Sequence, residues 1–368
     1  MDISPSGSRV VMDYRGDIIT LPAEKGDPRN LTNSTGAHEK YPSWTLDGKS
    51  VAWFSDASGE YKMQIQSQDG KGEVKSYKLP GTGFYAYAKW SPDSKKISFT
   101  DNGRNLYILD IESGAVKKVD SDELYAPGQF RQMFGDWSSD SRWILYTKMA
   151  KTYFKVVYLY SLDQQKSFPV TDGMCDASDP VFDPNGENIY FFASTDAGPV
   201  VNWFDLSNQD MKMTNSIWLA MLRKDIVSPF IKESDEEKVI KEAKDSVKQA
   251  DKNTKDVKST KAVAEKPKLL KIDTDGITDR TINLPVRAGD YYELNVGATG
   301  EIFYIARISG SSASPMLHKF DLKERKDSEV MEVNGYGISA DRKKMFYVKA
   351  RFMALQERGR SLKWARGS

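Results

Sequence analysis

The residue types that most often do chemistry are scarce in this 368-residue chain. It has two histidines, His38 and His318, and one cysteine, Cys175. A zinc site of the usual kind needs three or four ligands, and these three residues fall in different repeats of the sequence. We therefore expect no metal, no cofactor and no catalytic residue. A Ser–His–Asp triad around His38 is not excluded by spacing, because triads assemble in space, but the chain has no Gly-x-Ser-x-Gly elbow.

Aromatic residues gather instead in the segments that separate the repeats. The main segments are 81–87, 124–134 and 287–292, and 173–176 and 335–337 join them. The functional interpretation is a surface that contacts extended peptide or a neighbouring domain, with aromatic anchors and with Arg131 or Arg287 as a carboxylate partner. The alternative is that the rings pack between sheets. The candidate contact residues are Phe84, Tyr85, Tyr87, Tyr125, Phe130, Arg131, Phe134, Arg287, Tyr291, Tyr292 and Tyr336.

A recurrent turn motif indicates which elements position these segments. In its clearest copy, Trp137-Ser-Ser-Asp-Ser-Arg-Trp143, an apolar residue precedes a Ser/Asp-rich turn and an alternating strand follows. Ser, Asp, Asn, Gly and Pro suit such turns, so each copy predicts a hairpin between two strands. Most copies are separated by roughly forty to fifty residues, which is typical of the blades of a β-propeller. The copies begin at Ile3, Trp44, Trp90, Trp137, Phe182, Val296 and Ile338.

The motif therefore predicts an all-β fold, a seven-bladed β-propeller in one domain that spans residues 1–368. The blades are expected near 1–40, 41–86, 87–133, 134–178, 179–290, 291–334 and 335–368. Each four-stranded sheet buries its faces only against its neighbours, so a ring satisfies all of them. The segments that join one blade to the next would then lie at one mouth of the central tunnel.

Blade five is longer than the others. Its third strand is expected at Ser216–Leu222 and its outer strand at Leu269–Asp273. Between them, residues 232–266 contain no aromatic residue and no glycine and alternate Lys with Glu and Asp. Such a composition is typical of a solvated, mobile loop, and the alternative is a docking arm for another domain or protein.

Composition narrows the class of partner. The chain has 53 basic and 52 acidic residues, so it lacks the basic excess of a nucleic-acid binder. No apolar run approaches the roughly 20 residues needed to cross a bilayer. The amino terminus runs straight into the first repeat, so we expect no signal peptide. A cytoplasmic and a periplasmic location both remain open.

Several longer segments resemble the seven-bladed propeller of tricorn-type serine peptidases. The matching segments are 137–146, 170–173, 179–186, 217–230 with 234–237, and 272–286. In that family this propeller is joined to a six-bladed propeller, a PDZ module and a peptidase domain. The resemblance implies that the ring gates or guides unfolded peptides toward the peptidase domain and that no shared strand closes it. The implied partners are unfolded peptides and the PDZ and peptidase domains, which this chain does not contain.

Two other functions fit the same pattern. TolB-like propellers share the blade repeat, so the chain is alternatively a scaffold that binds another protein through its rim. A tunnel enzyme acting on a small molecule or a glycan is the third possibility. In the leading hypothesis the chain hydrolyses nothing by itself.

Overall fold

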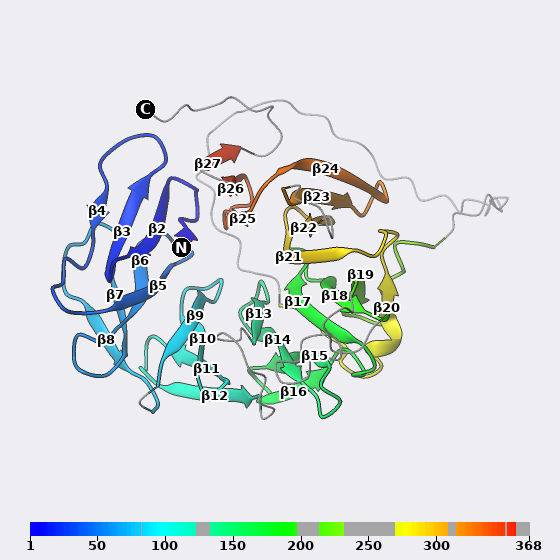
Figure 1. The fold of residues 1–368 in the computed structure, drawn as a ribbon. Helices are drawn as coiled ribbons and strands as arrows, with labels where there is room; N and C mark the ends of the chain where they lie inside the picture. The colour runs from blue at the N-terminus through cyan, green and yellow to red at the C-terminus, as the bar shows by residue number, and fades with distance from the viewer. Residues whose placement is uncertain are drawn as a thin grey trace, which may run out of the picture.

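The structure is a computed structural model, and its described residues are 1–81, 83–122, 133–196, 213–231, 269–307, 314–349 and, for the backbone alone, 352–357. Among these residues the strands form seven antiparallel sheets, six with four strands and one with three. Figure 1 shows the sheets arranged around a common axis. The all-β propeller fold predicted from the turn motif is therefore confirmed. No helix of the described residues is long and apolar enough to cross a membrane.

Within each sheet the strands follow one another in sequence, from the innermost outward. Blade one contains β1 (Asp2–Ile3), β2 (Arg9–Tyr14), β3 (Asp17–Pro22) and β4 (Arg29–Asn30). Blade two contains β5 (Glu39–Trp44), β6 (Ser50–Ser55), β7 (Lys62–Ser67) and β8 (Lys75–Lys78). Blade three contains β9 (Tyr85–Trp90), β10 (Lys96–Asp101), β11 (Asn105–Asp110) and β12 (Val116–Ser121). Blade four contains β13 (Phe134–Trp137), β14 (Trp143–Met149), β15 (Lys155–Ser161) and β16 (Lys166–Pro169).

The remaining three sheets follow the same order. Blade five contains β17 (Asp176–Phe182), β18 (Asn188–Ser194), β19 (Ser216–Met221) and β20 (Thr281–Asn283), the last preceded by the 3₁₀ turn η2 (Thr278–Arg280). Blade six contains β21 (Asp290–Val296), β22 (Glu301–Arg307), β23 (Met316–Asp321) and β24 (Lys326–Glu332). Blade seven contains β25 (Gly335–Ile338), β26 (Lys344–Lys349) and β27 (Phe352–Glu357).

The turn motif closes the first hairpin of a blade as its sequence predicts. In blade three the backbone N–H of Ser91 donates to the carbonyl oxygen of Lys96 at 2.9 Å, and the Ser91 hydroxyl contacts the Asp93 carboxylate at 2.6 Å. Ser94 takes the left-handed conformation (φ 56°) that lets the chain reverse. Ser138 and Asp140 make the same contact in blade four, at 2.6 Å.

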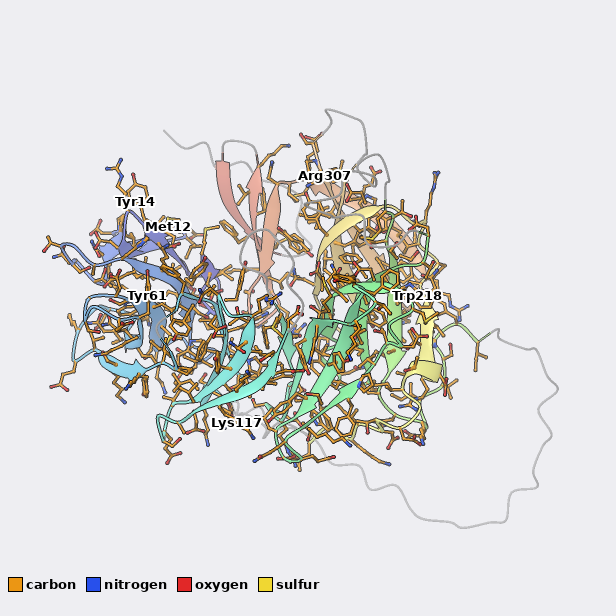
Figure 2. All side chains as sticks on the ribbon, turned by 60° about the horizontal axis from the view of Figure 1, so that its bottom comes forward. Met12, Tyr14, Tyr61, Lys117, Trp218 and Arg307 are labelled. Atoms are coloured by element: carbon orange, nitrogen blue, oxygen red, sulfur yellow. The ribbon has the colours of Figure 1, made fainter. Side chains whose placement is uncertain are left out.

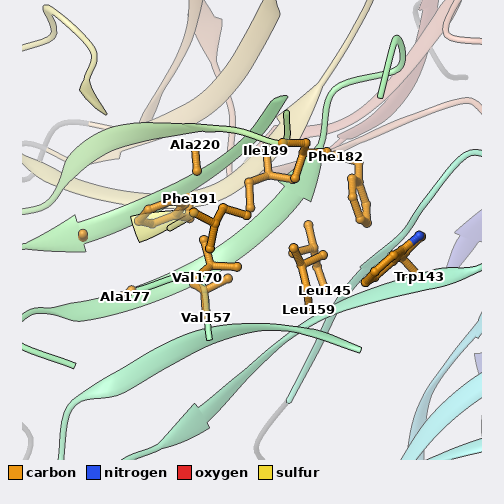
Figure 3. Close-up of a cluster of buried hydrophobic side chains, with 13 residues drawn as sticks. Trp143, Leu145, Val157, Leu159, Val170, Ala177, Phe182, Ile189, Phe191 and Ala220 are labelled. Carbon is orange, nitrogen blue, oxygen red and sulfur yellow. The ribbon is translucent and has the colours of Figure 1, made fainter. Parts of the chain in front are cut away.

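The hydrophobic core is divided among the interfaces between neighbouring blades. Six clusters of buried hydrophobic side chains are present, one at each interface between successive blades. The first lies between blades one and two and the last between blades six and seven. Figure 3 shows the cluster between blades four and five, with Phe191 and Ala220 of blade five near Val157 and Val170 of blade four. Among the described side chains no such cluster joins blade seven to blade one, where the backbone N–H of Asp341 donates to the Pro5 carbonyl oxygen at 3.2 Å.

The outer strand of blade five lies later in the sequence than predicted. Leu269–Asp273 forms no strand, and Thr281–Asn283 pairs with β19 instead. Other contacts hold Leu270 in place. Its backbone N–H donates to Asp140 Oδ2 at 2.9 Å. Its side chain packs directly on Gly186, where an added Cβ would stand only 2.1 Å from a Leu270 methyl carbon. Leu270 is therefore held against the first turns of blades four and five. The predicted loop at 232–266 lies outside the described residues.

Candidate functional site

One end of the ring carries both the segments that join successive blades and the hairpins between second and third strands, because neighbouring strands are antiparallel. We call this end the connector face. Among the described residues, the exposed large apolar side chains of this face include Tyr14 (54 %), Phe84 (57 %), Tyr153 (55 %) and Met174 (79 %). Figure 2 shows Tyr14 projecting from the blue sheet of blade one. The candidate set contained only Phe84; Tyr14 and Tyr153 belong to hairpins that reach the same end.

Phe84 is held in its exposed position by its neighbours. Its backbone N–H donates to Asn102 Oδ1 at 3.1 Å, and its carbonyl oxygen accepts from the Asn102 backbone N–H at 2.9 Å. Its ring centroid lies 5.7 Å from that of Tyr61. A fixed aromatic side chain loses little conformational freedom on binding, which favours such residues as contact anchors.

Tyr85 and Phe134 correct the predicted contact set, because both are buried, at 4 % and 3 % exposure. The Tyr85 ring lies 5.8 Å from Phe54, and its hydroxyl donates to the Pro80 carbonyl oxygen. The Phe134 ring packs 6.3 Å from Trp137. For these two residues the alternative, packing between blades, describes the structure.

The three candidate tyrosines of blades six and seven, Tyr291, Tyr292 and Tyr336, are half-buried. The Tyr291 ring lies 4.8 Å from that of Tyr304. The Arg307 guanidinium stands 4.9 Å above the Tyr292 ring, and the Tyr336 hydroxyl donates to the Glu293 carbonyl oxygen at 2.7 Å. Each therefore packs within or between blades along one edge and keeps another edge open to solvent.

The other candidates lie in different settings. Arg287 is exposed, and its carbonyl oxygen accepts a hydrogen bond from the Tyr291 hydroxyl. Tyr87 is half-buried, with its ring 5.9 Å from that of Tyr41. Tyr125, Phe130 and Arg131 lie outside the described residues. The contact role of the exposed and half-buried candidates stays a prediction.

The inner strands surround the axis of the ring and share a local irregularity. Their contacts link β1 to β5, β5 to β9, β13 to β17, β17 to β21, β21 to β25 and β25 back to β1. In four blades a bulge on the inner strand coincides with a residue in the left-handed conformation: Tyr41 (φ 53°), Tyr87 (φ 58°), Asp179 (φ 51°) and Glu293 (φ 55°). A left-handed residue at a bulge re-aims its side chain. No residue type in the sequence marks these bulges; only their position within the repeat does.

The bulges of blades five and six place two carboxylates close together. Asp179 and Glu293 are both open to solvent. Nevertheless desolvation raises the pKa of each carboxyl group, and the charge of Asp179 raises the pKa of Glu293 further. Both observations fit side chains that water reaches but that protein atoms surround closely. This part of the inner surface therefore carries an acidic pair.

Neutralising this pair is expected to stabilise the protein at neutral pH. The native pKa values are raised, so the native state holds these protons more tightly than the unfolded state, and stability falls as pH rises from about 4 through the raised values. The double variant Asp179→Asn, Glu293→Gln should have a higher urea midpoint than the wild type at pH 7. Below about pH 4 the difference should disappear, since both groups are then protonated.

Asp225→Asn is the matched control for this experiment. The hydrogen bond from Arg223 lowers the pKa of Asp225, so its removal should bring no gain at pH 7. An unchanged urea midpoint in the double variant would contradict the electrostatic account of the acidic pair.

Two further carboxylates of inner strands link neighbouring blades. Asp2 Oδ2 accepts from the backbone N–H of Trp44 at 2.8 Å, and Asp136 Oδ2 accepts from that of Phe182 at 3.1 Å. Lys89 Nζ lies 3.9 Å from Asp136 Oδ1, with its side chain 54 % exposed. Burial raises the pKa of Asp2 in spite of its hydrogen bonds. These carboxylates therefore hold neighbouring blades together.

The two histidines and the cysteine lie in separate environments. His318 Nδ1 is 2.9 Å from Asp327 Oδ2, and its ring stacks on Tyr304 at 5.1 Å. His38 is exposed in a cavity of about 490 Å³ on the connector face. Cys175 is half-buried, and burial raises the pKa of its thiol. Among the described residues no group of three His, Cys, Asp or Glu side chains is placed to hold a metal ion.

Comparison with known proteins decides the family. The family described as "Tricorn protease second beta propeller domain" matches residues 1–358. This chain belongs to that family. The tricorn protease homolog of Saccharolobus solfataricus is 23 % identical over 352 residues, which are 93 % of this chain and 29 % of the relative. Tricorn protease homolog 1 of Streptomyces coelicolor is 21 % identical over 91 % of this chain and 32 % of its own length.

A solved structure shows the same fold. The crystal structure of the tricorn protease superposes with a TM-score of 0.70 at 15 % identity, over 94 % of this tricorn-family chain and 32 % of the crystallised chain. The chain therefore spans about a third of the length of the relatives it matches. The tricorn-type resemblance of the sequence is confirmed.

Proposed function

We propose that this chain is the non-catalytic, substrate-guiding propeller of a longer tricorn-like peptidase. It receives unfolded peptide segments and directs them toward PDZ and peptidase domains that the chain itself does not contain. The observation that carries the proposal is the family match over residues 1–358, together with relatives named as proteases that are about three times as long.

The surfaces described above suit this role chemically. Exposed Tyr14, Phe84 and Tyr153 offer flat apolar contacts to any peptide side chain, whatever its sequence. Lys89 and Glu293 on the inner strands are open to solvent and bind backbone or side-chain groups by hydrogen bonds. Several weak contacts retain a bound peptide for enough time to guide it, but they do not fix it at one place.

The first test is catalytic. The 368-residue chain should release no fragments from casein or from short chromogenic peptides above a buffer blank. Hydrolysis that co-purifies with the chain and is abolished by serine-directed inhibitors would overturn the proposal.

The second test asks where an unfolded polypeptide binds. In a Cys175→Ser background, Glu293→Cys places a thiol on the inner surface, and Lys95→Cys places one on an exposed first turn of blade three. Reduced, alkylated casein should slow maleimide labelling of the thiol at position 293 severalfold and leave labelling at position 95 unchanged. Equal protection of both thiols, or of neither, would count against passage along the axis.

A further inference from the structure

A second polar site lies away from both the connector face and the inner strands. At the opposite end of the ring, where blades one and two meet, there is a cavity of about 550 Å³. Its lining comes from the start of β2, from β4, and from the first and last turns of blade two. The lining residues are Arg9, Arg29, Lys49, Ser67, Gln68 and Asp69.

Arg9 carries a half-buried guanidinium group, and its hydrogen bonds to described residues reach only neutral acceptors. Its Nη2 donates to the carbonyl oxygen of Thr20 (3.1 Å), the Thr20 hydroxyl (3.1 Å) and the carbonyl oxygen of Asp27 (3.0 Å). Its Nε is buried and has no partner among the described residues. Burial and the nearby charge of Arg29 lower the pKa of Arg9. An anion bound here would offset the cost of burying the Arg9 charge and the repulsion between Arg9 and Arg29.

The other charged groups around the cavity leave a positive surplus. Arg29 is exposed on β4 and forms no ion pair with a described residue. Lys49 Nζ lies 3.3 Å from Asp47 Oδ2. Asp69 accepts from the backbone N–H of Lys71 at 3.0 Å, and this hydrogen bond lowers its pKa, so it is charged at neutral pH. Lys71 also lies near Asp69, so the cations around the cavity, Arg9, Arg29, Lys49 and Lys71, outnumber Asp47 and Asp69.

We propose that this cavity binds the side-chain carboxylate of an acidic residue in a polypeptide. A surplus of positive charge favours an anionic group, and guanidinium groups bind carboxylates through two parallel hydrogen bonds. The cavity is far larger than a free carboxylate ion needs, so it also admits the chain that carries the group. Ser67 and Gln68 supply neutral hydrogen-bonding groups for that chain.

This inference does not depend on the proposed guiding function, because none of the lining residues belongs to the connector face or to an inner strand. It adds a peptide contact at the opposite end of the ring, with a stated preference for Asp or Glu.

The test follows the side-chain Nε–H signals of arginine by NMR in the 368-residue chain at low salt. Acetyl-Gly-Glu-Glu-Gly-amide is expected to shift the Arg9 and Arg29 signals in a saturable manner, and acetyl-Gly-Gln-Gln-Gly-amide is expected to leave them unmoved. Arg29→Gln should weaken binding of the acidic peptide about tenfold, as expected for a lost charge-assisted hydrogen bond. Lys95→Gln, which removes the same charge from an exposed turn of blade three, should not.

Three outcomes would overturn the proposal. The first is no shift with the acidic peptide, and the second is an equal shift with the glutamine peptide. The third uses inorganic phosphate as a further probe: if phosphate moves both arginine signals and the acidic peptide does not, the site does not take carboxylates. The Arg29 side chain forms no hydrogen bond or ion pair with a described residue, and a far-UV circular dichroism spectrum of Arg29→Gln checks that the variant is folded.

Discussion

Replacing Gly135 by alanine is expected to destabilise the protein by about 1–3 kcal/mol or more, as overpacking of a close contact does. Gly135 lies on β13 in blade four. A Cβ at this position would stand 2.6 Å from the carbonyl oxygen of Pro180 and 2.7 Å from its Cγ, on β17 of blade five. The carbonyl oxygen belongs to the backbone of a paired strand, so it cannot move without separating the two blades.

The same substitution at Gly337 is the matched control. Gly337 lies on β25, the inner strand of blade seven, and a Cβ there would meet no atom within 4 Å. Gly337→Ala should therefore leave stability unchanged or raise it slightly, because alanine restricts the unfolded chain. Urea unfolding of both variants followed by tryptophan fluorescence measures the difference. Equal midpoints for the two variants would show that blades four and five are not in contact at Gly135.

The fold could be predicted from the sequence because it is specified by residues that lie close together in the chain. In blades three, four and seven the first turn places a serine hydroxyl against an aspartate two residues later, as in Ser91 and Asp93, and such turns leave a visible repeat. The outer strand of blade five was misplaced for the opposite reason. Leu270 is apolar and sits in a strand-like pattern, but it packs on Gly186 and bonds to Asp140, which lie far away in the sequence.

The candidate site could be predicted less well from the sequence, because the solvent exposure of a side chain depends on which neighbour covers it. Phe84 and Tyr85 are adjacent aromatic residues, yet Phe84 is 57 % exposed and Tyr85 is 4 % exposed. Composition cannot distinguish them. The acidic pair Asp179 and Glu293 was invisible for another reason: the two residues are far apart in sequence, and they become neighbours only because each occupies the bulge of its own blade.

Alanine substitutions of two phenylalanines, Phe191 and Phe84, should separate the effects of buried and exposed aromatic residues on stability and on binding. Phe191 is 1 % exposed in the cluster between blades four and five (Figure 3). Phe191→Ala should cost about 3–5 kcal/mol, the usual range for a buried phenylalanine, since it removes apolar contacts and leaves a cavity. Thermal and urea unfolding measure this loss, and a cost below about 1 kcal/mol would mean that the cluster closes around the cavity.

Phe84→Ala should leave stability nearly unchanged and weaken the binding of unfolded polypeptide. The side chain is already largely in water, so its removal should change the free energy of unfolding by no more than about 0.5 kcal/mol. Because a fixed, exposed ring next to Tyr61 is the kind of residue that anchors a bound chain, the variant should bind unfolded casein about fivefold more weakly or worse. Fluorescence anisotropy with labelled casein measures this change. If Phe84→Ala binds casein as tightly as the wild type while remaining equally stable, Phe84 is not where the polypeptide first makes contact, and the acidic pair on the inner strands becomes the candidate contact.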